Sequence, residues 1–144
     1  MKKILILHGP NLNLLGVREP EVYGSMTLAE LNDALQTIAF EGGFELIISQ
    51  SNVEGELVNS LQEHGFSAHG IVFNPGGYTH TSVALRDAVS AIASPVIEVH
   101  LSHPDAREDF RKPSLLREAC FGSISGLGAE SYIAALRFFM EKQP

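Results

Sequence analysis

Two residues with complementary proton chemistry, Glu98 and His100, are separated by one residue within an apolar run. On a strand, this spacing directs both side chains to the same face. A carboxylate beside an imidazole fixes the tautomer of the ring and favours its protonated form, as a general acid requires. The same pair could equally be an ordinary ion pair at the end of a strand. His80 follows a glycine turn, where it could donate to a hydroxyl group or serve only the turn.

Tyr23 lies in a long polar segment, residues 9–24, that follows a short apolar run. A connection at the end of a strand normally needs few residues, and long loops in α/β proteins often carry binding and catalytic groups. A tyrosine has a pKa of about 10, so action as a base near neutral pH requires a fall of roughly two to three units. Arg18, together with Arg107 or Arg111, could stabilise the phenolate. The other interpretation is a surface loop without a role.

Short apolar runs alternate with helical patterns along the whole chain. Strands are predicted for residues 4–7, 44–49, 70–73, 96–99 and 121–125. Helices are predicted for residues 28–41, 54–63, 82–92 and 129–140, and the first begins at a capping box formed by Thr27 and Glu30. The alternation predicts a single domain over residues 1–144. Its fold is α/β in the flavodoxin-like manner, a five-stranded parallel sheet with helices on both faces.

The residues that could do chemistry follow the predicted strands. The carboxyl ends of parallel strands meet at one edge of the sheet, and ligands bind at that edge. Polar or titratable residues follow the first, third and fourth strands. The predicted site consists of Asn11, Arg18 and Tyr23 after the first strand, Asn74, Gly77 and His80 after the third, and Glu98, His100, Leu101, Ser102, Arg107 and Arg111 at the end of the fourth.

The charge balance limits the classes of ligand. A net charge of −7 argues against a nucleic-acid or anionic-membrane surface. Arg18, Arg107, Arg111 and Arg117 nevertheless lie in or beside predicted loops, which indicates either a local site for a small anion or scattered, solvated charge. The sequence contains no phosphate-binding loop, dinucleotide motif or nucleophile elbow. Its histidines lack metal-ligand spacing, and no lysine lies in a predicted apolar strand, which disfavours metal and Schiff-base chemistry.

Cys120 is the only cysteine, so an internal disulfide is excluded, and a small buried hydrophobic residue is the favoured interpretation of this thiol. The basic start, Met1 to Lys3, precedes only four apolar residues, too few for a signal peptide. No apolar run approaches the roughly 20 residues that span a membrane. We therefore expect a cytoplasmic protein.

Four motifs resemble those of the type II 3-dehydroquinate dehydratases, and the similarity covers nearly the whole chain. They are NLNLLGVREPEVYG at 11–24, SNVEGE at 51–56, NPGGYTHTS at 74–82 and EVHLS at 98–102. The resemblance implies the flavodoxin-like strand order 2-1-3-4-5 and a homo-oligomer, a dodecamer built from trimers. It also implies reversible loss of water from 3-dehydroquinate to give 3-dehydroshikimate, without metal or organic cofactor. This reaction serves the shikimate pathway of aromatic amino acid biosynthesis or quinate breakdown.

The resemblance also implies a mechanism. Tyr23, with its pKa held down by Arg18 and Arg107, is the base that removes a proton from carbon 2 of the substrate. His100, oriented by Glu98, is the acid that protonates the departing hydroxyl on carbon 1. The result is an anti elimination through an enolate.

Further residues match the family's binding positions. A water held near Asn11 and the glycine turn at Gly77 stabilises the enolate oxygen. The implied substrate ligands are Asn74 and the backbone N–H groups of Leu101 and Ser102 for the carboxylate, His80 and Arg111 for the ring hydroxyls, and Asp87 from a neighbouring subunit.

The sequence departs from the family pattern at Val53, where histidine is common, at Asp105, and at Lys112–Pro113. These differences bear on substrate affinity and subunit contacts rather than on the reaction class. Two alternatives are a non-catalytic flavodoxin-like module that binds a small carboxylate, and a different lyase or isomerase on the same scaffold. The first would tolerate loss of Tyr23 or His100, and the second would change the hydroxyl-binding residues.

Overall fold

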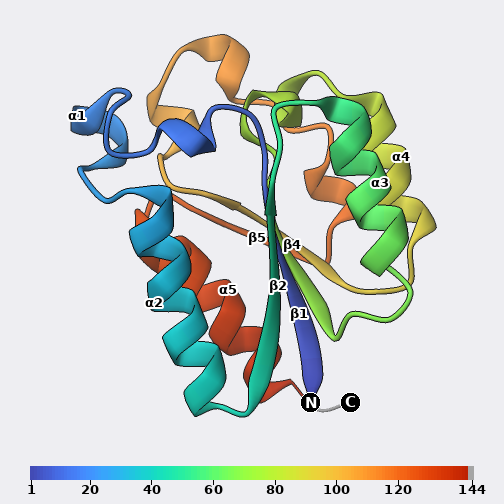
Figure 1. The fold of residues 1–144 in the computed structure, drawn as a ribbon. Helices are drawn as coiled ribbons and strands as arrows, with labels where there is room; N and C mark the ends of the chain where they lie inside the picture. Colours follow the sequence, from blue (N-terminus) through green and yellow to red (C-terminus); the bar gives the residue numbers. More distant parts are fainter. Residues whose placement is uncertain (143–144) are drawn as a thin grey trace.

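The computed structural model describes residues 1–142, apart from the side chains of Val22, Tyr23 and Asp105. Within this part lies one sheet of parallel strands in the order β2-β1-β3-β4-β5 (Figure 1). The strands are β1 (Lys2–His8), β2 (Phe44–Gln50), β3 (Gly70–Asn74), β4 (Val96–His100) and β5 (Gly122–Ser125). All the predicted strands and their order are confirmed.

Four strands end one residue later than predicted, each at a polar residue: His8, Gln50, Asn74 and His100. The predicted strands 4–7, 70–73 and 96–99 stopped where a polar residue follows the apolar run. Pairing continues because the ladder is made by backbone groups; His8, for example, lies opposite both Gln50 and Asn74 in the register.

Helices cover both faces of the sheet, as predicted. α2 (Leu28–Glu41) and α5 (Ala129–Glu141) lie together on one face, and α3 (Glu54–His64) and α4 (Val83–Ala91) lie on the other (Figure 1). α1 (Pro20–Tyr23) is a single turn in the loop after β1. Short 3₁₀ turns occupy Leu12–Leu14, Gly76–His80, Pro104–Ala106, Asp109–Arg111 and Arg117–Ala119.

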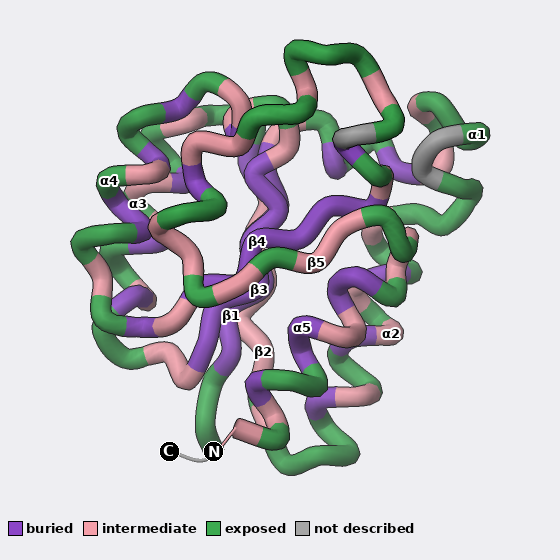
Figure 2. Tube along the Cα trace, turned by 180° about the vertical axis from the view of Figure 1, so that it is seen from behind, coloured by how far each residue is buried: buried purple, intermediate pink, exposed green. Residues whose placement is uncertain are grey.

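The alternation of side chains along β1 explains the two layers. Ile4 and Ile6 pack in the cluster that includes residues of α2 and α5, whereas Leu5 and Leu7 pack with residues of α3 and α4. All four are completely buried. Figure 2 shows that, among the described residues, the buried ones are concentrated in the central strands and exposed ones lie on the outer helices and loops.

Local signals define the helix starts. The Thr27 hydroxyl oxygen accepts from the backbone N–H of Glu30 (3.1 Å), and the Glu30 carboxylate accepts from the backbone N–H of Thr27 (3.3 Å). This is the predicted capping box. α4 begins one residue later than predicted because Ser82 caps it, its hydroxyl oxygen accepting from the Leu85 N–H (2.9 Å).

The connection from β4 to β5, residues 101–121, has 3₁₀ turns in place of a long helix. Leu116 in this connection is completely buried in the cluster that contains Leu85 and Val89 of α4. The connection therefore covers part of the α3/α4 face, and from there it carries Arg107 and Arg111 over the carboxyl edge of the sheet.

Candidate active site

A cavity of about 210 Å³ lies at the carboxyl edge of the sheet, where the loops after β1, β3 and β4 meet. The predicted convergence of these loops is therefore confirmed. Ten of the predicted site residues line the cavity: Asn11, Arg18, Asn74, Gly77, His80, His100, Leu101, Ser102, Arg107 and Arg111.

Two predicted residues stand apart from this lining, and the side chain of a third lies outside the described residues. Glu98 is completely buried on β4, behind His100. Asp87 is exposed on α4. Tyr23 ends α1, between Arg18 and the start of α2, but its side chain lies outside the described residues.

Gly9 brings the loops after β1 and β3 into direct contact. Its N–H donates to the carbonyl oxygen of Asn74 (2.7 Å), and a Cβ atom at this position would lie 2.7 Å from the carbonyl carbon of Pro75. No side chain fits there, so glycine is required. The Gln50 amide donates to the Gly9 carbonyl oxygen (3.1 Å) and fixes the same turn.

Asn11 lies just beyond this contact in a left-handed conformation, with φ 70°. Asparagine tolerates this region better than most residues. Its backbone N–H donates to the side-chain oxygen of Asn52 (2.9 Å). The hydrogen bond anchors the loop after β1 to the loop after β2, at the rim of the cavity.

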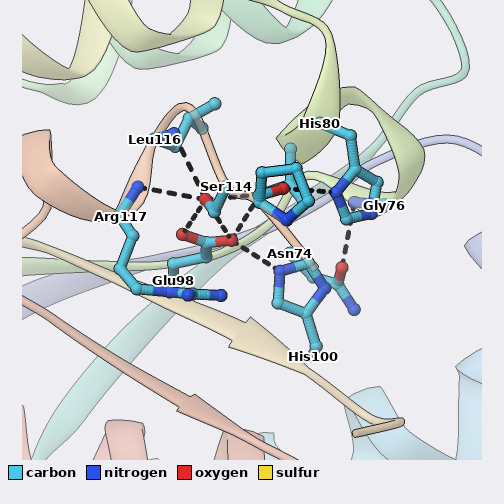
Figure 3. A network of polar contacts seen from close by, with 10 residues as sticks. Asn74, Gly76, His80, Glu98, His100, Ser114, Leu116 and Arg117 are labelled. Atoms are coloured by element: carbon cyan, nitrogen blue, oxygen red, sulfur yellow. Dashed lines mark hydrogen bonds and ion pairs between the residues drawn. The ribbon is translucent and has the colours of Figure 1, made fainter. Parts of the chain in front are cut away.

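Glu98 is the centre of a buried polar network (Figure 3). Its carboxylate accepts hydrogen bonds from His100 Nε2 (2.6 Å) and from the hydroxyl groups of Thr79 and Ser114, the latter at 3.0 Å to Oε1. Burial alone would raise the pKa of Glu98, but the hydrogen bonds and the charge of His100 outweigh it, so the pKa is lower than usual. Glu98 is therefore a carboxylate at neutral pH.

The predicted pair of Glu98 and His100 is thus confirmed, and its geometry assigns the ring nitrogens. Nε2 of His100 donates to the Glu98 carboxylate. The ring is nearly buried but lines the cavity. Nδ1 is therefore the ring nitrogen that is left to exchange a proton with a ligand.

Thr79 and Ser114 were missed by the reasoning from sequence. Ser114 donates to Glu98, and its oxygen accepts from the backbone N–H groups of Leu116 (3.2 Å) and Arg117 (3.1 Å). It therefore ties the β4–β5 connection to the buried carboxylate. The signal was indirect: a glutamate inside an apolar strand needs donors, and nearby Ser or Thr hydroxyls are candidates.

His80 is oriented by the backbone of the β4–β5 connection. Its Nδ1 lies 2.6 Å from the carbonyl oxygen of Pro113, so Nδ1 carries the hydrogen (Figure 3). In the neutral ring, Nε2 is then an acceptor for a ligand hydroxyl. The departure at Lys112–Pro113 keeps this contact because a backbone carbonyl makes it.

Three of the four loop arginines, Arg18, Arg107 and Arg111, line the cavity, which favours the local anion site over scattered charge, whereas Arg117 is not part of the lining. The Glu19 carboxylate lies 3.4 Å from Arg18 Nη2 and 3.7 Å from Arg107 Nη2, so it bridges the two guanidinium groups. Arg111 Nε donates to Glu108 (2.6 Å). The cavity of an acidic protein is thus locally rich in positive charge, which suits a small anion.

The remaining sequence features lie away from the cavity. Val53 is half exposed at the start of α3. Cys120 is half-buried, and burial raises the pKa of its thiol to about 12, so it is not a nucleophile. Within the described residues, no group of three or more His, Cys, Asp or Glu side chains is arranged to hold a metal ion. None of the described helices is long and apolar enough to cross a membrane.

Known proteins resemble this chain over nearly its whole length. A family model described as "Dehydroquinase class II" matches residues 2–140. The 3-dehydroquinate dehydratase of Pelotomaculum thermopropionicum is 57% identical over 135 residues, 94% of each chain. That of Bordetella avium is 55% identical over 138 residues, 95% of this chain and 96% of its own.

Solved structures agree with these relatives. The crystal structure of a type II dehydroquinase from Butyrivibrio crossotus matches with a TM-score of 0.94 at 40% identity, covering 96% of this chain and 97% of that one. A type II dehydroquinase from Propionibacterium acnes has the same TM-score at 34% identity, over 99% and 98% of the two chains.

Proposed function

The chain belongs to the class II dehydroquinase family, and from this premise we propose that it removes water from 3-dehydroquinate, reversibly, by an anti elimination through an enolate. Its named relatives are 3-dehydroquinate dehydratases, so it is an enzyme of the hydro-lyase class. The observation that carries the proposed mechanism is the buried carboxylate of Glu98 against His100, at the wall of an arginine-lined cavity.

His100 is the general acid of the proposal. Nδ1 of its imidazolium gives a proton to the hydroxyl that leaves carbon 1, and the hydroxyl departs as water. Glu98 keeps Nε2 protonated and stabilises the cation before transfer. The negative charge of Glu98 is maintained by donors from Thr79 and Ser114.

Tyr23 is the proposed base. As a phenolate it takes the proton from carbon 2, next to the ketone, and the electron pair left behind forms the enolate. Arg18 precedes Tyr23 on the same loop, and Arg107 shares the Glu19 carboxylate with Arg18. Two guanidinium groups near the loop favour the charged form of a phenol.

The ketone oxygen becomes negative during this step and needs donors. A water between Asn11 and the turn at Gly77 serves this purpose in the proposal; both residues line the cavity. The β3 turn carries Gly77 and the β1 loop carries Asn11, and the contact at Gly9 holds these two segments together.

Substrate recognition uses the rest of the lining. Asn74 and the backbone N–H groups of Leu101 and Ser102 bind the carboxylate. Nε2 of His80 accepts from a ring hydroxyl, because Nδ1 is engaged by Pro113. Arg111 binds another hydroxyl.

Assembly completes the proposal. Asp87 is exposed on α4 and is proposed to reach the site of a neighbouring subunit, in a trimer that builds a dodecamer. A cytoplasmic location and a role in the shikimate pathway also belong to the proposal.

The test follows the ultraviolet absorbance of the conjugated enone carboxylate after protein is added to 3-dehydroquinate, with and without borohydride and a chelator. We expect a rise that neither reagent prevents, because the proposed route uses neither an imine nor a metal. No rise with folded, assembled protein would contradict the proposal and favour a non-catalytic carboxylate-binding module.

Replacing the base tests the mechanism separately. Tyr23→Phe removes only the phenolic oxygen, so we expect turnover to fall by at least about 1,000-fold while substrate binding is largely kept. Single-turnover kinetics and calorimetric titration measure the two quantities. Full activity of Tyr23→Phe would exclude the tyrosinate base without affecting the assignment of the reaction.

A further inference from the structure

The SNVEGE motif, residues 51–56, is not used by the proposed mechanism. In the structure it forms the loop after β2 and the start of α3. Ser51 is buried; its hydroxyl group donates to the Glu56 carboxylate (2.7 Å), and its oxygen accepts from the backbone N–H of Val53 (2.9 Å). These two contacts fix the loop on both sides of Asn52, which is exposed.

The side-chain oxygen of Asn52 is held by two donors. The backbone N–H of Asn11 donates to it (2.9 Å), and so does the side-chain amide of Gln50 (3.2 Å). The same Gln50 nitrogen donates to the Gly9 carbonyl oxygen (3.1 Å), which uses both of its hydrogens. Because a backbone N–H can only donate, the oxygen of the Asn52 amide, rather than its nitrogen, faces Asn11.

The main chain of Asn11 is fixed on both sides by contacts of this kind. Its N–H donates to Asn52, and its carbonyl oxygen accepts from the backbone N–H of Leu14 (3.0 Å). A φ of 70° is sparsely populated by residues other than glycine, so it depends on such contacts. Asn11 itself lines the cavity. The hydrogen bond to Asn52 therefore helps to set how Asn11 is presented to a ligand.

The backbone of Asn52 contacts the turn after β3. The Tyr78 hydroxyl group donates to the Asn52 carbonyl oxygen (3.0 Å). Tyr78 directly follows Gly77, which lines the cavity, and Tyr78 packs against the apolar cluster of the α3/α4 face. Asn52 thus binds both the loop that carries Asn11 and the turn that carries Gly77.

We propose that Asn52 is a positioning residue, which acts through Asn11 and Tyr78 to set the separation of the two segments that hold the water at the enolate oxygen. The inference rests on the proposed function for the identity of that water and of the enolate. Asn52 lies outside the lining of the cavity, so it acts only through its neighbours. Preorganised donors stabilise the charge that develops in the transition state more than they stabilise the substrate. The effect is therefore on kcat rather than on KM.

The first variant is Asn52→Ala, which removes the acceptor for Asn11 and leaves the backbone carbonyl that Tyr78 contacts. Because Asn52 is exposed in a loop, this variant leaves the apolar core intact. We expect kcat to fall about tenfold and KM for 3-dehydroquinate to stay within about twofold. An unchanged kcat, or a rise in KM alone, overturns the proposal.

The second variant is Tyr78→Phe, which removes the hydroxyl group and keeps the ring packed. We expect kcat to fall about three- to fivefold, since the contact at Gly9 still joins the two segments. In the double variant the losses should not multiply, because both hydrogen bonds maintain the same separation. A double variant whose loss equals the product of the single losses contradicts the proposal.

The matched control is Ser94→Ala. The Ser94 hydroxyl group donates to the carbonyl oxygen of Ala68 (2.7 Å) and so joins the segments that precede β4 and β3, at the opposite edge of the sheet. This variant also loses one side-chain hydrogen bond between two connections. We expect it to lower Tm and to leave kcat unchanged. Equal losses of kcat in Ser94→Ala and Asn52→Ala would make the role of Asn52 merely structural and overturn the proposal.

The pH profile of kcat tests whether Asn52 acts through the proposed base or acid instead. Tyr23 belongs to the same loop as Asn11, so a general displacement of this loop would also disturb the base. We expect kcat of Asn52→Ala to fall by the same factor at every pH, with both limbs of the profile in place. A shifted limb would assign the effect to Tyr23 or His100 and overturn the proposal.

A spectroscopic measurement separates this inference from the proposed reaction. Nitrogen-15 NMR of the ligand-free protein reports the backbone amide signals of Asn11 and Gly77 whether or not the protein turns over a substrate. We expect both signals to move in Asn52→Ala and to stay in place in Ser94→Ala. If the wild-type protein shows no turnover, the proposed function fails, whereas an unmoved Asn11 signal overturns the positioning role itself.

Discussion

Glu98 and His8 occupy matching places on opposite faces of the sheet. Both are completely buried near the carboxyl ends of strands, Glu98 on the α3/α4 face and His8 on the α2/α5 face. The Glu98 carboxylate accepts from three side chains and keeps its charge. His8 meets one acceptor, the Asn32 side-chain oxygen, and one neutral donor, the Tyr132 hydroxyl group, and stays uncharged.

The difference shows that burial alone does not decide the protonation state of a group. Burial opposes the charged form at both sites, but hydrogen bonds to the charged form overcome this cost only at Glu98. In the proposed mechanism, the charged network supports proton transfer at His100. The neutral network is suited to hold a fixed set of hydrogen-bond directions.

The largest effect is expected for Glu98→Gln, which removes the charge of the Glu98 side chain and keeps its shape. We expect kcat to fall by at least about 100-fold because a neutral amide no longer stabilises the His100 imidazolium. Steady-state kinetics measure the loss, and thermal unfolding confirms that the variant is folded. A kcat near that of the wild-type protein would show that the charge of Glu98 is not needed.

The second test concerns His8, the uncharged member of the pair, and the pH dependence of the free energy of unfolding. The folded-state pKa of His8 is about 4 and its ordinary value is 6.5, so between these pH values the unfolded chain binds more protons. The free energy of unfolding therefore decreases as the pH falls through this window, and the part due to His8 reaches about 3 kcal/mol near the lower end.

His8→Gln removes this titration while its amide can still accept from Tyr132 and donate to Asn32. We expect the variant to lose less stability than the wild-type protein as the pH falls from neutral toward 4.5, in denaturant titrations. Glu98 is present in both proteins, and its lowered pKa makes stability fall mainly below its ordinary value of 4.5, so Glu98 does not separate the two curves. Parallel curves for the two proteins would mean that His8 is protonated in the folded state.

Ser114→Ala should have a smaller effect. It removes one of the three side-chain donors to Glu98 and the acceptor for the N–H groups of Leu116 and Arg117. We expect the free energy of unfolding to drop by about 1–2 kcal/mol and kcat to fall by less than about tenfold. Ser114→Thr retains the hydroxyl and is the matched control; equal losses in the two variants would exclude the hydrogen bonds as the cause.

The smallest effect is expected outside both networks. Lys112 and Asp109 form an ion pair of 3.0 Å, but their side chains are 52% and 95% exposed. Lys112→Ala should therefore change the free energy of unfolding by less than about 0.5 kcal/mol in chemical denaturation. A larger loss would show that this connection depends on its surface charges as well as on Ser114.

Contacts between residues that are close in the sequence were predicted correctly. The capping box at Thr27 and the pairing of Glu98 with His100 follow from spacing alone, and both are confirmed. The convergence of Asn11, Asn74 and Arg107 followed from the parallel order of the strands and is confirmed as well.

Long-range hydrogen bonds were not predictable in the same way. Thr79 and Ser114 are 19 and 16 residues from Glu98, and a single hydroxyl leaves no periodic pattern. The predicted first strand stopped at residue 7, although alternation with Ile4 and Ile6 places His8 toward the core. Tyr132 lies 124 residues from His8, and no sequence rule joins them.

The contact at Gly9 has a consequence for redesign of the cavity. A larger residue there would meet the backbone of Pro75 rather than a movable side chain, so directed evolution should recover only glycine at this position. The wall formed by Pro10 and Gly76 is then effectively immovable. Selection for a bulkier substrate must therefore enlarge the cavity where side chains rather than backbone form its lining, as at Arg107 and Arg111, and a broadened substrate range will arise there first.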